Sequence, residues 1–253
     1  MPRANRHYLP GHVWHITHRC HRKQFLLKLA CDRRAWMRWL YAAHKRYGLC
    51  VLNYTVTSNH IHLLVRDRGK GEIARSLQLV AGRTAQSYND RKNRRGAFWE
   101  DRYHATAVET GEHLVRCVTY IDLNMVRAGV VEHPVQWKAG GYHEIQAPPA
   151  RCRIVDREAL AEVVGVGTVD GLAKAHEEWI EAALADGVQR RVPEWSESIA
   201  VGGREFVERI SNELGARARH RKVEACGDLA VLRDPDAPYS HHFGIEMAGF
   251  SSK

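Results

Sequence analysis

Residues 49–65, with the sequence LCVLNYTVTSNHIHLLV, decide the fold of this chain. β-Branched and other large apolar residues dominate both halves of the stretch, which predicts strands at 49–57 and 61–65. Ser58 and Asn59 separate the two apolar runs and are residue types typical of a tight turn. The stretch is therefore predicted to form a β-hairpin, with His60-Ile61-His62 at the start of its second strand.

Regular patterns continue on both sides of this hairpin. Residues 11–19 (GHVWHITHR) are rich in β-forming residues and predict a preceding strand. Apolar residues at spacings of three and four predict helices at 29–47, 72–89 and 112–127, and a fourth strand is expected at 98–108. The order strand, helix, strand, strand, helix, strand, helix predicts an α+β fold, namely a ferredoxin-like antiparallel sheet with packed helices.

The segment Ala147-Pro148-Pro149-Ala150 is typical of a domain boundary. We therefore expect one domain at 1–147 and a mostly helical C-terminal region at 148–253. Within this region, helices are predicted at 156–164, 172–185 and 205–221, with a connector at 193–203. The tail from Gly227 has no clear periodicity and is expected to be partly disordered.

The composition is that of an ordinary globular protein. Of the 253 residues, 44% are hydrophobic and 26% are charged, and no apolar run approaches the roughly 20 residues that span a bilayer. Because no secretory signal is recognisable, we expect a cytosolic protein and not a membrane protein. The six cysteines form no CxxC pair, which argues against a zinc ribbon and a disulfide framework.

Charge is distributed unevenly along the chain. Residues 1–150 contain 24 Lys and Arg against 11 Asp and Glu, a net charge of +13, whereas residues 151–253 carry −4. Neutralisation of phosphates by Lys and Arg dominates nucleic-acid affinity, so this excess indicates a polyanionic partner. A basic surface that only aids solubility is the alternative.

Two short motifs could supply chemistry. On a strand, His60 and His62 share a face, so their imidazoles can converge on one divalent cation. Tyr120 and Asn124 are four residues apart and share a helix face, which places a candidate nucleophile beside a candidate oxygen ligand. Each motif alone is a weak signal, because both spacings also occur by chance and suit a structural role.

Three motifs in order resemble those of single-tyrosine HUH transposases, most closely the REP-associated tyrosine transposases. They are SNHIHLLV at 58–65, FWEDRY at 98–103 and YIDLNMVRAG at 120–129, and the resemblance covers about residues 7–145. It implies a ferredoxin-like HUH nuclease domain in which His60, His62 and Asn124 bind Mg²⁺ or Mn²⁺ and Tyr120 is the nucleophile. Met125 departs from the family pattern, in which proline commonly follows the asparagine.

The resemblance also implies a reaction and its partners. It implies a metal-dependent endonuclease and strand transferase that cleaves single-stranded DNA through a 5′-phosphotyrosine, at hairpin DNA formed by repetitive palindromic sequences. We expect a cytoplasmic, nucleoid-associated monomer and not a homodimer, with a C-terminal region that regulates the enzyme or binds DNA. A catalytically inactive, sequence-specific DNA-binding protein and an RNA-binding or RNA-processing protein on the same fold are the alternatives.

Basic residues near these motifs are candidates for DNA contacts, and solvated turn charges are the alternative interpretation. The candidates are Arg19, Arg22, Lys23, Arg91, Lys92, Arg94, Arg95 and Arg102. The aromatic residues beside them could stack on bases, although Trp99 is expected in the core. Histidines also recur at every third position from His12 to His21, a spacing that fits neither a strand face nor a helix face, so we expect no second metal site there.

Overall fold

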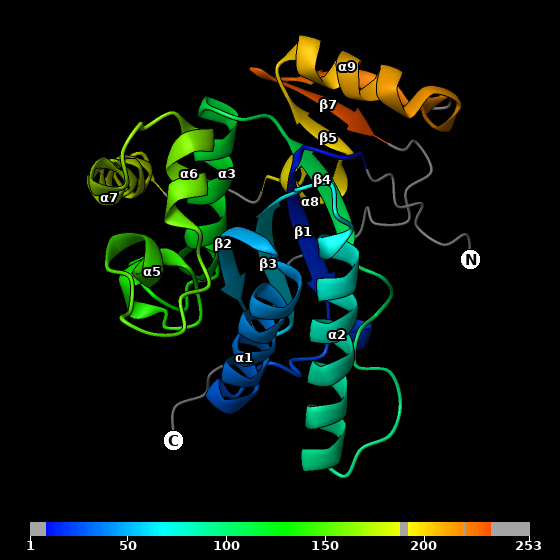
Figure 1. The fold of residues 1–253 in the computed structure, drawn as a ribbon, viewed down its shortest axis with the longest axis vertical. Helices are drawn as coiled ribbons and strands as arrows, with labels where there is room; N and C mark the ends of the chain where they lie inside the picture. Colours follow the sequence, from blue (N-terminus) through cyan, green and yellow to red (C-terminus); the bar gives the residue numbers. More distant parts are fainter. Residues whose placement is uncertain (1–8, 188–191, 220, 234–253) are drawn as a thin grey trace.

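The computed structural model describes residues 9–187, 192–219 and 221–233 (Figure 1). Its centre is a sheet of seven strands in the order β2-β3-β1-β4-β5-β7-β6. The first four strands are β1 (Val13–Arg19), β2 (Cys50–Val56), β3 (His60–Arg66) and β4 (His104–Val108). They pair antiparallel in the order β2-β3-β1-β4, and the helix α1 (Ala30–Tyr47) connects β1 to β2 while α2 (Glu72–Arg91) connects β3 to β4. This is the predicted ferredoxin-like arrangement.

The two faces of this four-stranded part differ in polarity. Trp14, Ile16, Tyr54, Ile61 and Leu63 are buried on one face, and α1 packs there because Trp36 lies against Tyr54 with 6.2 Å between ring centroids. The pairing register places Thr17 opposite His62 on the other face, which also carries Asn53, Thr55 and Thr106. Buried polar groups need hydrogen-bond partners. α3 and the segments that follow it in the sequence provide these partners, since Asn53 donates to Asp122 and Thr106 donates to the Ser198 carbonyl.

Two predicted elements are shorter than expected. The fourth strand begins at His104 instead of residue 98, because Trp99 turns aside to stack on His18, with 4.1 Å between ring centroids, and donates from Nε1 to the Ala81 carbonyl at 3.0 Å. The helix predicted at 112–127 is divided into α3 (Glu112–Asp122) and α4 (Asn124–Arg127). Leu123, with ψ of 3°, turns the chain between them.

The C-terminal region contains the expected helices and three strands that were not predicted. The expected helices are α6 (Arg157–Val164), α7 (Val169–Ala185) and α9 (Arg204–Leu214), the last of which ends before the predicted residue 221. Two short helices were not predicted: α5 (Tyr142–Gln146), which precedes the region, and α8 (Glu194–Glu197), which lies in the expected connector. The strands are β5 (Ala200–Gly202), β6 (Lys222–Cys226) and β7 (Leu229–Arg233). β5 pairs parallel with β4, so the region extends the same sheet, with α9 against its added strands (Figure 1).

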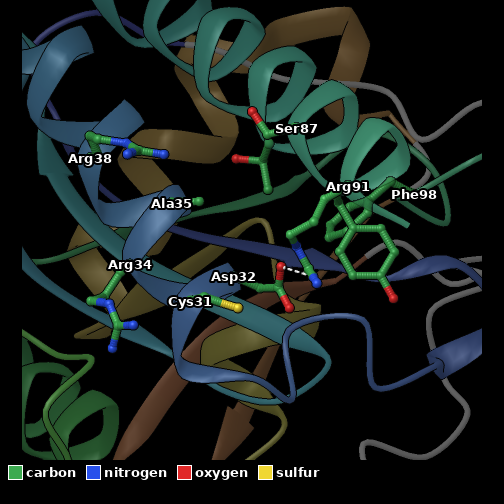
Figure 2. A pocket seen from close by; sticks show the side chains of 10 residues that line it. Cys31, Asp32, Arg34, Ala35, Arg38, Ser87, Arg91 and Phe98 are labelled. Carbon is green, nitrogen blue, oxygen red and sulfur yellow. Dashed lines mark hydrogen bonds and ion pairs between the residues drawn. The ribbon is translucent and has the colours of Figure 1, made fainter. Parts of the chain in front are cut away.

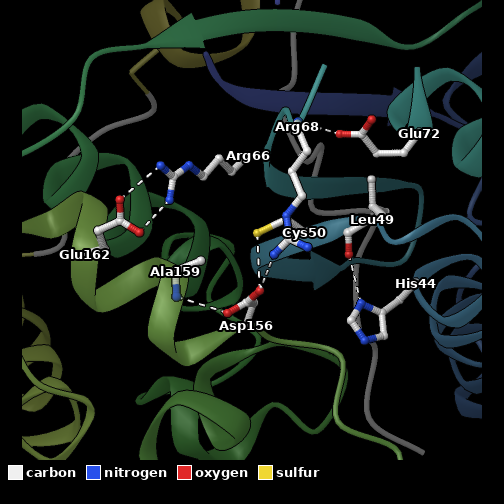
Figure 3. A network of polar contacts seen from close by, with 9 residues as sticks. All are labelled: His44, Leu49, Cys50, Arg66, Arg68, Glu72, Asp156, Ala159 and Glu162. Carbon is white, nitrogen blue, oxygen red and sulfur yellow. Dashed lines mark hydrogen bonds and ion pairs between the residues drawn. The ribbon is translucent and has the colours of Figure 1, made fainter. Parts of the chain in front are cut away.

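Ion pairs join the first part of the C-terminal region to the hairpin (Figure 3). Arg66 donates to both carboxylate oxygens of Glu162 at 2.7 and 3.0 Å, and Arg68 donates to Asp156 at 2.9 Å. Asp156 also caps α6 by accepting from the Ala159 N–H. The boundary predicted at 147/148 stays a prediction. The tail expected to be disordered from Gly227 begins with β7, and the remainder, residues 234–253, lies outside the described residues.

Among the described residues, no helix has the length and apolar character needed to cross a membrane. All six cysteines are free thiols, and three of them, Cys20, Cys50 and Cys117, are buried. Each of the six lies in a different element or loop.

Candidate active site

The site forms where His60 and His62 point from β3 toward α3 and α4. Both imidazoles are nearly buried, with 8% and 1% of each residue exposed. Their Nε2 atoms lie 3.0 Å apart, and their rings meet edge to face with 4.9 Å between centroids. The convergence expected from their spacing on a strand is therefore present.

Hydrogen bonds around His60 determine which of its nitrogens carries the proton. The Thr57 hydroxyl donates to the His60 carbonyl at 2.9 Å, so its oxygen can only accept from the imidazole. Nδ1 of His60 lies 2.9 Å from that oxygen and 2.7 Å from Oδ1 of Asn59. Both neighbours are acceptors, so Nδ1 is the donor and Nε2 of the neutral ring keeps its lone pair toward His62.

His62 contacts a third histidine on the same face. Nδ1 of His62 lies 2.9 Å from Nε2 of His15, and the two rings stack with 5.1 Å between centroids. Nδ1 of His15 lies 2.7 Å from the carbonyl oxygen of Trp195 in α8. Burial lowers the pKa of His15 to about 4, so this ring is neutral at pH 7.

Asn124, the first residue of α4, completes the group. Its Nδ2 atom lies 2.9 Å from Nε2 of His62. The nitrogen and oxygen of an amide exchange places by a rotation of the side chain, so the same position can present an oxygen. The described residues contain no group of three His, Cys, Asp or Glu side chains suited to a metal, and a metal here would therefore use two imidazoles and this amide.

The donors fit a divalent cation. Two neutral imidazole nitrogens and an amide oxygen are ligands that Mn²⁺ accepts readily and Mg²⁺ less so. Nitrogens separated by 3.0 Å with their lone pairs facing each other repel unless a cation or a proton lies between them. The two nitrogens therefore share either a proton or a cation, and their separation leaves both able to bind one ion.

Tyr120 lies directly beside this group. Its ring meets His62 edge to face with 5.8 Å between centroids, and the residue is 7% exposed. The Arg127 guanidinium lies over the same ring, 4.0 Å from the centroid, and donates to the Tyr120 carbonyl at 2.6 Å. Burial lowers the pKa of Arg127 from its ordinary value, but a guanidinium stays charged. A cation over the ring favours the negative charge of an ionised tyrosine.

A pocket opens beside Tyr120. Its volume is about 680 Å³, and Arg127, Trp179 and Trp195 contribute to its walls together with Tyr120. Arg116 also lines it and is paired with Glu112 and Asp228. The tyrosine therefore borders a space that residues of α3, α4, α7 and α8 enclose.

A buried polar network holds the tyrosine helix in place. Asp122, at the end of α3, accepts from Asn53 Nδ2 of β2 at 3.0 Å and lies 2.8 Å from Nε2 of His176 in α7. Nδ1 of His176 lies 2.8 Å from the amide nitrogen of Gln146, which therefore donates and leaves Nε2 to donate to Asp122. The network joins α3 to the sheet and to the C-terminal region.

We expect His176→Phe to lower the free energy of unfolding by about 3 kcal/mol, because it leaves the buried Asp122 carboxylate without one donor while keeping ring volume. Urea unfolding followed by circular dichroism measures the change. Lys174→Ala, at an exposed position of the same helix, is the matched control and should stay within about 0.5 kcal/mol of the parent. Equal midpoints for both variants would contradict this role of the network.

The candidate DNA contacts fall into two groups. Arg19 lies opposite His60 in the sheet and pairs with Glu100, while Arg22 and Lys23 are exposed in the turn that follows. That turn touches the turn before His60, since Asn59 Nδ2 donates to the Lys23 carbonyl at 3.3 Å. Arg102 is half-buried in the loop before β4. The first group thus lies at the same end of the hairpin as the histidines.

The second group surrounds the end of α2. Arg91 pairs with Asp32 beside a pocket of about 520 Å³ between α1 and α2, lined also by Arg34 and Arg38 (Figure 2). Arg94 folds back on its own loop, donating to Asn89 Oδ1 at 3.0 Å and to the Ala97 carbonyl at 2.9 Å. Lys92 and Arg95 are exposed. Their role in DNA binding stays a prediction, and the contacts of Arg94 indicate a structural role in the loop.

The histidines spaced at three residues point to different neighbours. His12 lies 3.2 Å from Glu213 and His18 lies 2.8 Å from the Asp101 carbonyl, whereas His15 reaches His62. Sequence reasoning missed His15 because its relevance depends on the register between β1 and β3. It also assigned no role to Arg127, although the residue lies within the quoted motif at 120–129.

Comparison with known proteins shows which families and structures the chain is similar to. Residues 10–124 match the family model of IS200-like transposases, and no curated protein matches the chain. Among solved structures, a REP-associated tyrosine transposase bound to a REP hairpin has 16% identity and a TM-score of 0.49, covering 62% of this chain and 94% of its own. A candidate transposase from Deinococcus radiodurans R1 has 13% identity and a TM-score of 0.34, covering 51% and 98%.

At these identities and TM-scores, the similarity rests on the sequence match, which includes β3, the strand that carries both histidines, and ends at Asn124. Residues 10–124 are therefore similar to the IS200-like transposase family.

Proposed function

We propose that this protein is a metal-dependent endonuclease and strand transferase that acts on single-stranded DNA through a phosphotyrosine intermediate. The observation that carries the proposal is the convergence of His60, His62 and Asn124 on one point, with the Tyr120 ring packed against His62. Two nitrogen ligands, one amide ligand and an adjacent phenol are the parts that this chemistry requires.

Tyr120 acts as the nucleophile in this proposal. Its hydroxyl oxygen attacks the scissile phosphorus, a new P–O bond forms, and the bond from phosphorus to the 3′-oxygen breaks. The phenol loses a proton and the departing 3′-oxygen gains one, so charge and atoms balance. A free 3′-hydroxyl and a 5′-phosphotyrosine remain, and because the new ester keeps the bond energy, another 3′-hydroxyl can reverse the step or join a different strand without ATP.

His60, His62 and Asn124 would hold a divalent cation, which supplies charge neutralisation at the phosphate when it is bound. The chain contributes the remaining functions. Thr57 and Asn59 orient the His60 ring, and Arg127 favours the ionised form of Tyr120 from its position over the ring. The pocket beside Tyr120, with the half-buried Trp179 in its wall, offers an aromatic surface to a nucleotide that approaches the phenol.

The proposed substrate is single-stranded DNA next to a hairpin, in keeping with the resemblance of the three motifs to REP-associated tyrosine transposases. The net charge of +13 in residues 1–150 suits a polyanionic strand. We further propose that the protein acts as a monomer in the nucleoid.

The test is the formation of a covalent complex. Purified protein is mixed with a labelled DNA hairpin that carries a single-stranded flank, with Mn²⁺, with Mg²⁺ or with EDTA, and the products are separated in SDS. We expect an SDS-resistant adduct with either metal and none with EDTA. Binding without an adduct under every metal condition would identify an inactive DNA-binding protein. Stronger competition by the RNA version of the hairpin would indicate an RNA-directed protein, because the 2′-hydroxyl distinguishes the two.

We expect Lys92→Ala/Arg95→Ala to weaken hairpin binding and to flatten its salt dependence. Each phosphate that the protein no longer neutralises should reduce the slope of log K against log salt by about 0.7, so the double variant should reduce it by about 1.4. Fluorescence anisotropy across a range of salt concentrations measures the slope, and single-turnover cleavage at saturating protein should be nearly unchanged. Lys174→Ala, at an exposed position of the acidic C-terminal region, is the control, and a double variant with the parental slope would show that Lys92 and Arg95 do not contact DNA.

A further inference from the structure

We propose that His15 is a positioning residue for the metal site and that the Trp195 carbonyl in the C-terminal region sets its orientation. The inference rests on the proposed function, because it concerns the ligand His62. It assigns to β1 and α8 a role in the site that the three motifs do not contain.

The Trp195 carbonyl can only accept a hydrogen bond. It lies 2.7 Å from Nδ1 of His15, so Nδ1 carries the proton. The ring is fully buried between the Trp195 carbonyl and His62, where a second ring proton would bring an unpaired charge into the interior, so its Nε2 atom is an acceptor. That atom lies 2.9 Å from Nδ1 of His62, which must therefore donate. The remaining nitrogen of His62, Nε2, is left with its lone pair directed at His60 and Asn124.

The chain of two hydrogen bonds thus selects the tautomer of His62 that can bind a metal. Without it, the His62 proton is free to occupy Nε2, where it would block the site. A metal-binding histidine usually donates its other ring N–H to a carboxylate or a carbonyl, which fixes the ring and raises its basicity. Here the neutral imidazole of His15 takes the place of that partner. Because His15 is itself oriented by the Trp195 carbonyl, this backbone group fixes the His62 tautomer through the His15 ring.

The carbonyl belongs to a segment that lies far from His62 in the sequence. Trp195 is in α8, and the residue is 3% exposed. Next to it, the Ser198 carbonyl accepts from the Thr106 hydroxyl at 2.6 Å, and Thr106 faces His15 across the β1–β4 pairing. The C-terminal region therefore covers the polar face of the sheet at the position of His15, and we expect metal affinity to depend on the Trp195 carbonyl.

The test is a calorimetric titration of the full chain with Mn²⁺. We expect His15→Phe, which keeps a ring but neither hydrogen bond, to raise the Kd for Mn²⁺ by about 10- to 100-fold. His15→Gln can offer an amide oxygen to His62 and an amide N–H to Trp195, so it should stay within a few-fold of the parent. Thr106→Val removes a neighbouring bond to the same segment without touching His62, and its Kd should equal that of the parent.

A second readout needs no variant. Long-range ¹H–¹⁵N correlation of the metal-free protein reports which nitrogen of each histidine is protonated, and we expect the proton of His62 on Nδ1. A proton on Nε2 would overturn the inference. Parental Mn²⁺ affinity in His15→Phe, or an equal loss of Mn²⁺ affinity in Thr106→Val, would also overturn it.

His62→Ala distinguishes failure of the metal site from failure of the role of His15. If it binds Mn²⁺ like the parent, the proposed metal site is wrong, whereas weak binding in His62→Ala with no change in His15→Phe would leave that site intact and remove His15 from it.

Discussion

Tyr120→Phe is expected to abolish the covalent protein–DNA adduct, with a fall in its rate of formation of about 10⁵-fold or more. The variant lacks only the hydroxyl oxygen that, in the proposed reaction, forms the bond to phosphorus. The phenyl ring still fills the space between His62 and the Arg127 guanidinium, so the fold and the affinity for the uncleaved hairpin should be nearly unchanged. Denaturing electrophoresis of labelled DNA gives the adduct, and anisotropy gives the affinity.

Two other tyrosines provide the controls for this prediction. Tyr142, in α5, packs against His176 with 5.2 Å between ring centroids, and Tyr103 lies beside His18 in the loop before β4. Tyr142→Phe and Tyr103→Phe should form the adduct at the parental rate. Peptide mapping of the adduct by mass spectrometry decides the assignment directly, and a phosphotyrosine at either of these positions would exclude Tyr120 as the nucleophile.

The sequence predicted those parts of the fold that depend on the pattern of residues close together in the chain. Alternating and helical apolar patterns located β1 to β3, α1 and α2 to within a few residues, and these elements determine a ferredoxin-like order. The spacing within His60-Ile61-His62 also predicted convergence, since period two on a strand needs no partner strand to be known. The helix pattern at 112–127 placed Tyr120 and Asn124 together, although Leu123 divides the helix between them.

The remaining features depend on contacts between distant residues. His15 reaches His62 only because Thr17 pairs with His62 in the antiparallel register, and a shift of one residue would turn His15 to the opposite face. The Trp195 carbonyl is a backbone group, so no side-chain pattern marks it. β5 contains three residues and is fixed by its pairing with β4, which explains why a segment expected to be a connector extends the sheet.

Replacement of the paired histidines is expected to have the second large effect. His60→Ala and His62→Ala should each lower the rate of adduct formation by about 10²- to 10³-fold, because a bound cation contributes several kcal/mol to stabilisation of charge on the phosphate. Since two ligands of one cation act as a unit, the double variant should be little worse than either single one. Calorimetric titration with Mn²⁺ should show weak binding or none in all three.

A histidine of α3, the helix that carries Tyr120, provides the control for this prediction. His113 lies in α3 and pairs with Glu109 at 3.4 Å, so His113→Ala changes the same helix without removing a proposed ligand. It should retain parental Mn²⁺ affinity and adduct formation, and all variants should bind the hairpin equally in EDTA, because the basic surface is intact. Fully additive effects of His60→Ala and His62→Ala would mean that the two imidazoles act independently, whereas the 3.0 Å between their Nε2 atoms leads us to expect that they bind one ion together.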